Sequence, residues 1–134
     1  MTLRYLLDTH VLLRWLAEPT KLSREQLRVL RNGVQRNQPV GVSAISLVEI
    51  AVLFGDGSQR MRIGMAGLLD ELGSNPVFRI LPISTEIAAE IHGLGGALRD
   101  PADRTIVATA RVHRLSLITS DQRIVESGLV SVVE

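Results

Sequence analysis

The 134-residue chain has no cysteine, a single lysine at Lys21 and only 3% aromatic residues. Without cysteine, neither a disulfide framework nor a thiolate metal site can form. Because Lys21 lies outside any glycine-rich pattern, a phosphate-binding loop ending in Gly-Lys-Ser/Thr is excluded. No Gly-x-Ser-x-Gly elbow of a serine hydrolase occurs. No apolar run approaches the roughly 20 residues that cross a bilayer, so we expect no membrane association.

The remaining composition indicates a globular protein. Hydrophobic residues make up 46% of the chain, and the mean hydropathy is +0.21. A chain of this length fits one domain, which we expect to span residues 1–134, with a core of Leu, Ile, Val and Ala. The N-terminus lacks the pattern of a secretory signal, so a cytoplasmic location is expected.

Net charge gives no argument for a nucleic-acid partner, because it is only +1. The basic residues are nonetheless all arginine except Lys21, and the arginine fork matches phosphate geometry. A GC-rich genome produces the same bias without any function. Arg24, Arg28 and Arg31 recur at helical spacing, which favours a solvated helix face over a partner surface.

Short apolar runs alternate with segments of helical periodicity along the whole chain. This alternation predicts an α/β fold in which a five-stranded, mainly parallel sheet is flanked by helices on both faces. Capping boxes are expected at Ser23 with Gln26 and at Ser46 with Glu49. The expected strands cover residues 4–7, 40–43, 78–82, 115–119 and 130–133, and the expected helices cover 11–18, 23–36, 46–54, 61–72, 84–92, 101–114 and 121–126.

Four acidic residues lie close to these strand ends and helix starts. Asp8, Glu49 and Asp121 each follow an expected strand, and Asp103 lies in the first turn of the helix opened by Asp100 and Pro101. The carboxyl ends of parallel strands share one edge, where ligands bind, so the four side chains should converge. Crowded carboxylates raise one another's pKa, and a divalent cation relieves the repulsion. Because Mg²⁺ and Mn²⁺ prefer oxygen ligands, we predict a metal site suited to phosphodiester hydrolysis.

Helix capping is the alternative explanation for each acid. Aspartate is a favoured N-cap, and acids in a first turn complement the helix dipole. Glu49 would complete the capping box of Ser46, and Asp103 could pair loosely with Asp100. Of the three histidines, His10 is nearest a proposed ligand, and it could contact a substrate or a partner.

Four segments resemble the motifs of the PIN-domain family, in the family's order. They are Leu6-Leu7-Asp8-Thr9-His10-Val11-Leu12-Leu13, the run from Val42 to Ala51, Arg99-Asp100-Pro101-Ala102-Asp103-Arg104, and Leu117-Ile118-Thr119-Ser120-Asp121. The resemblance implies strand order 3-2-1-4-5 and a Mg²⁺- or Mn²⁺-dependent endoribonuclease with Asp8, Glu49, Asp103 and Asp121 as its acidic cluster. It also implies supporting roles for Thr9, Ser43 and Thr119, and an acid of less defined role at Asp100.

The length and the Asp8-Thr9-His10 opening most closely resemble VapC-type toxins of bacterial toxin–antitoxin pairs. This implies RNA as substrate, a cognate antitoxin as partner and a homodimer. The apolar segment from Val52 to Leu69 either contributes to a groove for an antitoxin helix or is ordinary core. Two rival functions remain: a PIN-type nuclease of RNA maturation without an antitoxin, and a non-catalytic relative that binds RNA or protein.

Overall fold

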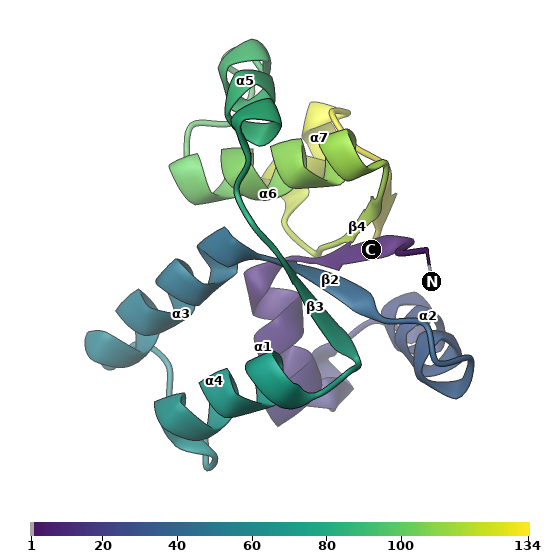
Figure 1. The fold of residues 1–134 in the computed structure, drawn as a ribbon, viewed down its shortest axis with the longest axis vertical. Coiled ribbons are helices and arrows are strands. Elements are labelled where there is room, and N and C mark those ends of the chain that lie inside the picture. Colours follow the sequence, from purple (N-terminus) through teal and green to yellow (C-terminus); the bar gives the residue numbers. More distant parts are fainter. Residues whose placement is uncertain (1) are drawn as a thin grey trace.

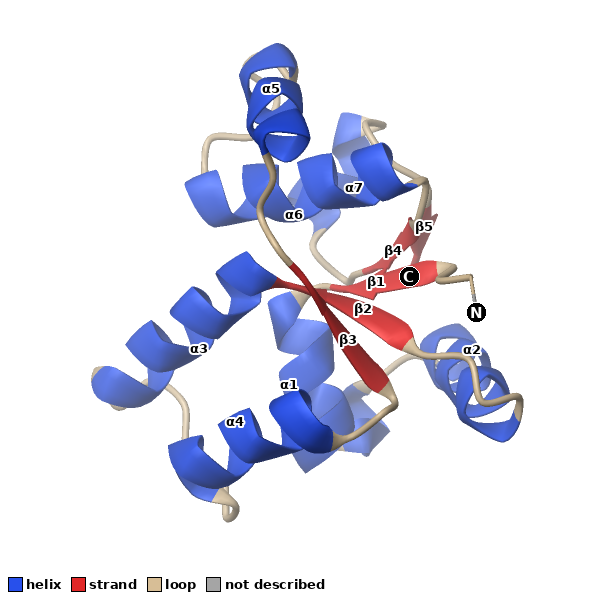
Figure 2. Cartoon of the chain, in the orientation of Figure 1, coloured by secondary structure: helices blue, strands red, loops and turns tan. Residues whose placement is uncertain are grey.

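Five parallel strands form one sheet in the order β3-β2-β1-β4-β5, in a computed structural model that describes residues 2–134 (Figures 1 and 2). All four strand pairings are parallel. The predicted parallel sheet and the order implied by the family resemblance are therefore confirmed; Met1 of the predicted domain lies outside the described residues. The strands are β1 (Tyr5–Leu7), β2 (Val40–Ser43), β3 (Phe78–Leu81), β4 (Ser116–Ile118) and β5 (Val132–Val133).

The helices begin and end mostly where the sequence predicts. The capping box of Ser23 and Gln26 forms at the start of α2, and Asp100 caps α6 with Pro101 as its first residue. No helix in residues 2–134 has the length and apolarity needed to span a membrane. The helices are α1 (Thr9–Ala17), η1 (Pro19–Lys21, a 3₁₀ turn), α2 (Arg24–Gln35), α3 (Ala44–Gly55), α4 (Gly64–Ser74), α5 (Thr85–Gly93), α6 (Pro101–His113) and α7 (Gln122–Ser127).

Three helix starts differ from the prediction, and the first is α1, which begins at Thr9 rather than at residue 11. The capping box of Ser46 with Glu49 is wrong, because α3 begins two residues earlier with Ser43 as its cap. The side chain of Ser43 accepts a hydrogen bond from the backbone N of Ile45 at 3.2 Å. Helix α4 begins at Gly64 rather than at residue 61, because Gly64 adopts a φ of 72°, which glycine tolerates and which interrupts the helical path.

The sheet separates two hydrophobic cores. Leu6 and Leu7 of β1 are both fully buried but belong to opposite cores, as the alternation of side chains along a strand requires. Helices α1 and α4 pack with β1 on one face, and α5, α6 and α7 cover the other (Figure 1). Since both faces are covered, the central strand β1 is a short, continuous apolar run.

The strand order brings the carboxyl ends of β1 and β4 together. β1 pairs with both β2 and β4, so the chain reverses its direction of travel across the sheet there. The backbone N of Asp8 donates to the carbonyl of Ile118 at 3.0 Å, which holds Asp8 beside the segment that follows β4. A ligand crevice is expected at such a reversal in an open α/β sheet.

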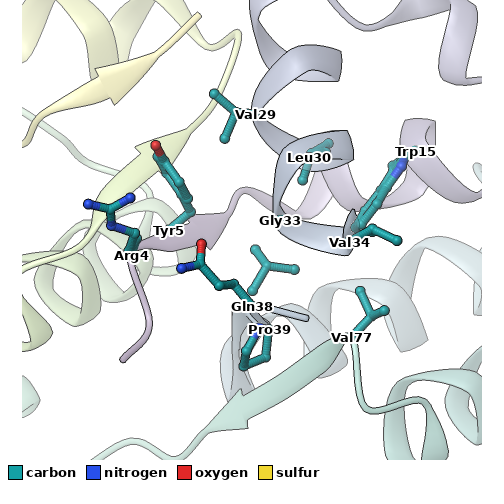
Figure 3. Close-up of a pocket in the computed structure, with 11 residues that line it drawn as sticks. Arg4, Tyr5, Trp15, Val29, Leu30, Gly33, Val34, Gln38, Pro39 and Val77 are labelled. Carbon is teal, nitrogen blue, oxygen red and sulfur yellow. The ribbon is translucent and has the colours of Figure 1, made fainter. Parts of the chain in front are cut away.

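A small cavity lies at the opposite end of the strands, where they begin. Arg4, Tyr5, Pro39 and Val77 line it from positions at or before the strand starts, together with side chains of α2 (Figure 3). Its volume is about 20 Å³, enough for roughly one water molecule. This cavity is too small to admit a nucleotide.

Candidate functional site

The four predicted acids line one cavity of about 240 Å³ at the carboxyl edge of the sheet. Asp8 follows β1, Glu49 lies in the second turn of α3, Asp103 in the first turn of α6, and Asp121 at the N-cap of α7. The fold therefore brings together residues that are far apart in the chain. The full lining is Asp8, His10, Val11, Arg14, Glu49, Asp100, Asp103, Ser120, Asp121 and Arg123.

The side chain of Asp8 is held by a hydrogen bond from a threonine and not by a helix-capping hydrogen bond. The residue occupies the N-cap position of α1, but its side chain makes no capping hydrogen bond. Instead, Thr119 Oγ1 donates to Asp8 Oδ2 at 2.6 Å, and Asp8 is only 6% exposed. The same Thr119 oxygen accepts from the backbone N of Asp121 at 3.1 Å. Capping does not account for Asp8, and Thr119 supports two of the acids at once.

Glu49 is oriented by a chain of two hydroxyl groups. Thr9 Oγ1 donates to Glu49 Oε1 at 2.5 Å and lies 2.7 Å from Ser46 Oγ. A threonine hydroxyl has one proton, so when it donates to Glu49 the proton between Thr9 and Ser46 must come from Ser46. Thr9 and Ser46 are both fully buried. Ser46 is therefore part of the support of Glu49 and not the helix cap that the sequence pattern suggests.

Asp100 and Asp121 do cap helices. Asp100 Oδ1 accepts from the backbone N of Ala102 at 2.8 Å and of Asp103 at 3.2 Å. Asp121 Oδ1 accepts from the backbone N of Arg123 at 3.0 Å. At the start of α6, the backbone N of Asp103 therefore donates to the cap, Asp100. The carboxylate of Asp103 itself does not act as a cap.

Arg123 forms ion pairs with Asp103 and Asp121. Its Nη2 lies 3.0 Å from Asp121 Oδ2 and 3.5 Å from Asp103 Oδ2. The guanidinium also approaches Asp121 Oδ1 through Nε at 3.3 Å. This fork partly neutralises the side of the cavity formed by α6 and α7.

Burial and mutual repulsion raise the pKa of three of the acids. Burial raises the pKa of Asp8 against the lowering effect of the Thr119 hydrogen bond, and burial raises the pKa of Glu49 with a contribution from Asp8. Burial, followed by the charges of Asp100 and Asp121, raises the pKa of Asp103 to about 6. The Arg123 hydrogen bond instead lowers the pKa of Asp121. Carboxylates in this condition gain most from a nearby cation.

The donor set fits a hard divalent cation that keeps part of its water shell. All the acidic donors are oxygens, which Mg²⁺ and Mn²⁺ prefer. Within residues 2–134, no group of three or more His, Asp or Glu side chains forms a ready-made ligand cage. Mg²⁺, however, usually keeps several waters and takes only one or two carboxylates directly. Acids spaced around a cavity of about 240 Å³ have the chemistry and the room for such an ion.

Three lining residues and one supporting residue escape the sequence reasoning. Arg14 lies one helical turn beyond His10, so helical spacing from the Asp8 motif could have found it. Ser120 and Arg123 flank Asp121, but nothing in the sequence distinguishes Arg123 from the other arginines. Ser46 was noticed as a cap, and only the buried contact with Thr9 reveals its position in the site.

The sequence matches the PIN domain family over residues 5–128. Among curated proteins, it is 33% identical over 120 residues to Ribonuclease VapC22 of Mycobacterium tuberculosis, which covers 89% of this chain and 88% of that protein.

Several solved structures have the same fold. FitAcB from Neisseria gonorrhoeae is 26% identical with a TM-score of 0.68, covering 97% of this chain and 96% of that one. A toxin–antitoxin complex from Klebsiella pneumoniae is 25% identical with a TM-score of 0.65 and the same coverage. VapBC2 from Rickettsia felis, bound to a fragment of promoter DNA, has a TM-score of 0.72 at 16% identity over 98% of both chains, which shows the fold alone.

The raised pKa of Asp103 predicts a pH-dependent effect of its removal. In EDTA, Asp103→Asn should melt at a higher temperature than wild type near pH 8, and this advantage should vanish below about pH 4. The folded protein prefers the protonated carboxyl, so the stability that Asp103 contributes is full below its ordinary pKa of 3.8 and is lost as pH rises through about 6. Thermal melts across this range measure the difference.

Asp56→Asn is the control, because the pKa of Asp56 is shifted in the opposite direction: the hydrogen bond with Ser58 lowers it. That variant should gain no stability near pH 8. An Asp103→Asn variant that is less stable than wild type near pH 8 would show that burial and neighbouring charges do not destabilise the ionised form of this carboxylate.

Proposed function

The chain belongs to the PIN-domain family, and on this premise we propose that it is a divalent-metal-dependent endoribonuclease, the toxin of a toxin–antitoxin pair. The observation that carries the proposal is the convergence of Asp8, Glu49, Asp103 and Asp121 on one cavity at the carboxyl edge of the sheet. The sequence similarity to a curated VapC ribonuclease supports the choice of RNA as substrate. The action of the protein on RNA would take place in the cytoplasm.

In the proposed mechanism, Asp8, Glu49, Asp103 and Asp121 hold Mg²⁺ or Mn²⁺, directly or through water. The ion supplies a water that is nucleophilic at neutral pH and stabilises negative charge on the phosphate. Thr119 keeps the Asp8 carboxylate in place, and Thr9 does the same for Glu49. These hydroxyl groups orient the carboxylates before the substrate arrives, which avoids reorganisation during the reaction. No covalent intermediate with the protein is needed.

The two rival functions have less support. A non-catalytic relative would have no use for a buried Asp8 and a hydroxyl-braced Glu49, neither of which serves as a cap. A nuclease of RNA maturation without an antitoxin would fit the same cavity, but the solved proteins of this fold include a toxin–antitoxin complex. We therefore favour the toxin.

A groove separate from the acidic cavity is the proposed antitoxin site. It has a volume of about 500 Å³ and lies between the end of α1 and the segment that leads into α4. Ile63 is 49% exposed, and a Cβ built on Gly67 would stand only 2.4 Å from Ile63 Cγ1, so Gly67 lets this side chain lie flat against α4. An amphipathic helix binds a surface of this kind through its apolar face. The lining is Leu16, Ala17, Glu18, Arg60, Met61, Arg62, Ile63, Leu68 and Glu71.

Part of the apolar segment predicted to contact an antitoxin lines this groove, and part does not. Met61, Ile63 and Leu68 line it, although Leu68 is also fully buried in the core and Met61 packs against that core; Met65 packs against the core but does not line the groove. The charged residues at its borders, Glu18 and Arg62 among them, could fix the register of a bound helix. The homodimer implied by the family resemblance stays a prediction.

Metal dependence is the first expectation of the proposal. Mn²⁺ or Mg²⁺ should raise the melting temperature of the purified protein, because an ion that binds only the folded state stabilises it by mass action. The same ions should support cleavage of RNA to products with 5′-phosphate and 3′-hydroxyl ends. Cleavage that persists in EDTA, or products ending in 2′,3′-cyclic phosphate, would exclude this mechanism.

Amide substitutions separate metal ligands from helix caps. Asp8→Asn, Glu49→Gln and Asp103→Asn should fold but lose cleavage, on the order of 100-fold or more, because an amide brings no charge to the ion. Asp121→Asn should lose least if that acid acts through water. Asp100→Asn is the matched control and should be nearly silent, since asparagine caps a helix about as well as aspartate. Single-turnover cleavage of all five variants gives the comparison. Near-normal rates in the first three would require abandoning the nuclease assignment.

The groove predicts a variant that loses the partner but keeps the nuclease. Ile63→Glu places a charge on the apolar wall and should weaken antitoxin binding by about tenfold or more, since a buried unpaired charge is strongly unfavourable. Val34→Glu is the control, because Val34 is 46% exposed on α2, outside the groove. Calorimetric titration with the purified cognate antitoxin measures both. Equal affinities for the two variants would place the antitoxin elsewhere.

A further inference from the structure

Arg123 forms ion pairs with two of the four carboxylates of the acidic cavity. Its Nη2 contacts Asp121 Oδ2 at 3.0 Å and Asp103 Oδ2 at 3.5 Å. The side chains of Asp103 and Asp121 are 13% and 21% exposed, whereas that of Arg123 is 73% exposed. The acids are thus fixed in the wall of the cavity, and the arginine reaches them from solvent.

This arrangement is held by charge and not by packing. An ion pair with so exposed a partner contributes little to stability, and a competing cation can break it. A divalent ion carries twice the charge of the guanidinium in a smaller volume, so its attraction to the same oxygens is stronger. An ion that binds Asp103 Oδ2 or Asp121 Oδ2 competes with Arg123 Nη2 for that oxygen.

A displaced Arg123 stays at the mouth of the cavity. The residue lies in the first turn of α7, two positions after Asp121, so its backbone cannot follow the displaced side chain away from the site. The planar guanidinium then has its donors free, and a phosphate group is an anion whose geometry matches them. The phosphates of an RNA strand that enters the cavity would come within its reach.

We propose that Arg123 is a tethered counter-ion of the acidic cavity, which a divalent ion displaces and which then binds a phosphate of the RNA backbone. The inference rests on the proposed function, because it requires that the acids hold an ion. It adds a residue that couples the two binding events: the ion releases the arginine, and the arginine then holds the substrate. Arg123 would thereby contribute to RNA binding mainly when the ion is bound.

Metal binding tests the first half without any measurement of activity. Mn²⁺ is titrated calorimetrically into wild type, Arg123→Gln and Arg14→Gln. Both variants remove one positive charge from the lining of the cavity, but in the part of the chain that the structure describes only Arg123 forms ion pairs with the acids. Arg123→Gln should bind Mn²⁺ about two- to fivefold more tightly than wild type, the range expected from the loss of exposed ion pairs. Arg14→Gln should show a smaller change.

RNA binding tests the second half. The anisotropy of a fluorescently labelled single-stranded RNA is measured in the cold in Mn²⁺ and in EDTA, with its integrity checked on a denaturing gel. Arg123→Gln should weaken RNA binding severalfold more in Mn²⁺ than in EDTA, where the acids already engage the guanidinium. Arg14→Gln should weaken binding by a similar factor in both conditions, because no acid holds Arg14 in the described structure.

Failure of the proposed function and failure of the Arg123 role give different results in these experiments. Failure of wild type to bind Mn²⁺ would refute the proposed function, and this inference with it. If wild type binds Mn²⁺ but Arg123→Gln binds it no more tightly than Arg14→Gln does, the counter-ion role is refuted while the nuclease proposal stands. If Arg123→Gln weakens RNA binding equally in Mn²⁺ and in EDTA, the proposal that the ion releases Arg123 to bind RNA is likewise refuted.

Discussion

The burial of neighbouring carboxylates at the carboxyl edge of the sheet is the constraint around which this site is built. Asp8, Glu49 and Asp103 all have raised pKa values, for which burial is the first cause and neighbouring acids a further one. A protein keeps such a cluster only if the surrounding structure holds it in place. Here the centre of a parallel sheet does so, because Asp8 directly follows a strand that is paired on both sides.

Hydroxyl groups and one guanidinium make this cluster tolerable. Thr119 reaches Asp8 across 111 positions of the chain, and Thr9 reaches Glu49 across 40. Their hydrogen bonds stabilise the charged forms and so oppose the effect of burial. The same contacts aim the two carboxylates, so electrostatic relief and geometric preorganisation come from the same side chains. Arg123 partly neutralises Asp103 and Asp121 on the other side of the cavity. Its side chain lies in solvent, where another cation can replace it.

Much of the fold could be predicted because each local signal agrees with the final structure. The capping box of Ser23, the Asp100-Pro101 start of α6 and the apolar runs of the strands all lie where expected. The misassigned cap at Ser46 has a physical cause: a serine three residues before a glutamate fits a capping box, and Ser43 fits a cap equally well. Only the buried contact of Ser46 with Thr9 distinguishes the two. The start of α4 was misplaced because the periodicity of its side chains does not reveal the positive φ of Gly64.

The sequence by itself determined the α/β class, the four acids and the family to which they point, because apolar period, helix signals and motif order are local properties of the chain. Tertiary structure alone decided which groups hold each acid in place, since that depends on partners distant in sequence. Asp100 and Asp121 bond to their own helix starts, whereas Asp8 and Glu49 bond to threonines from other elements. It also singled out Arg123 from fourteen arginines, because a role set by distance to Asp103 leaves no pattern in the residues around it.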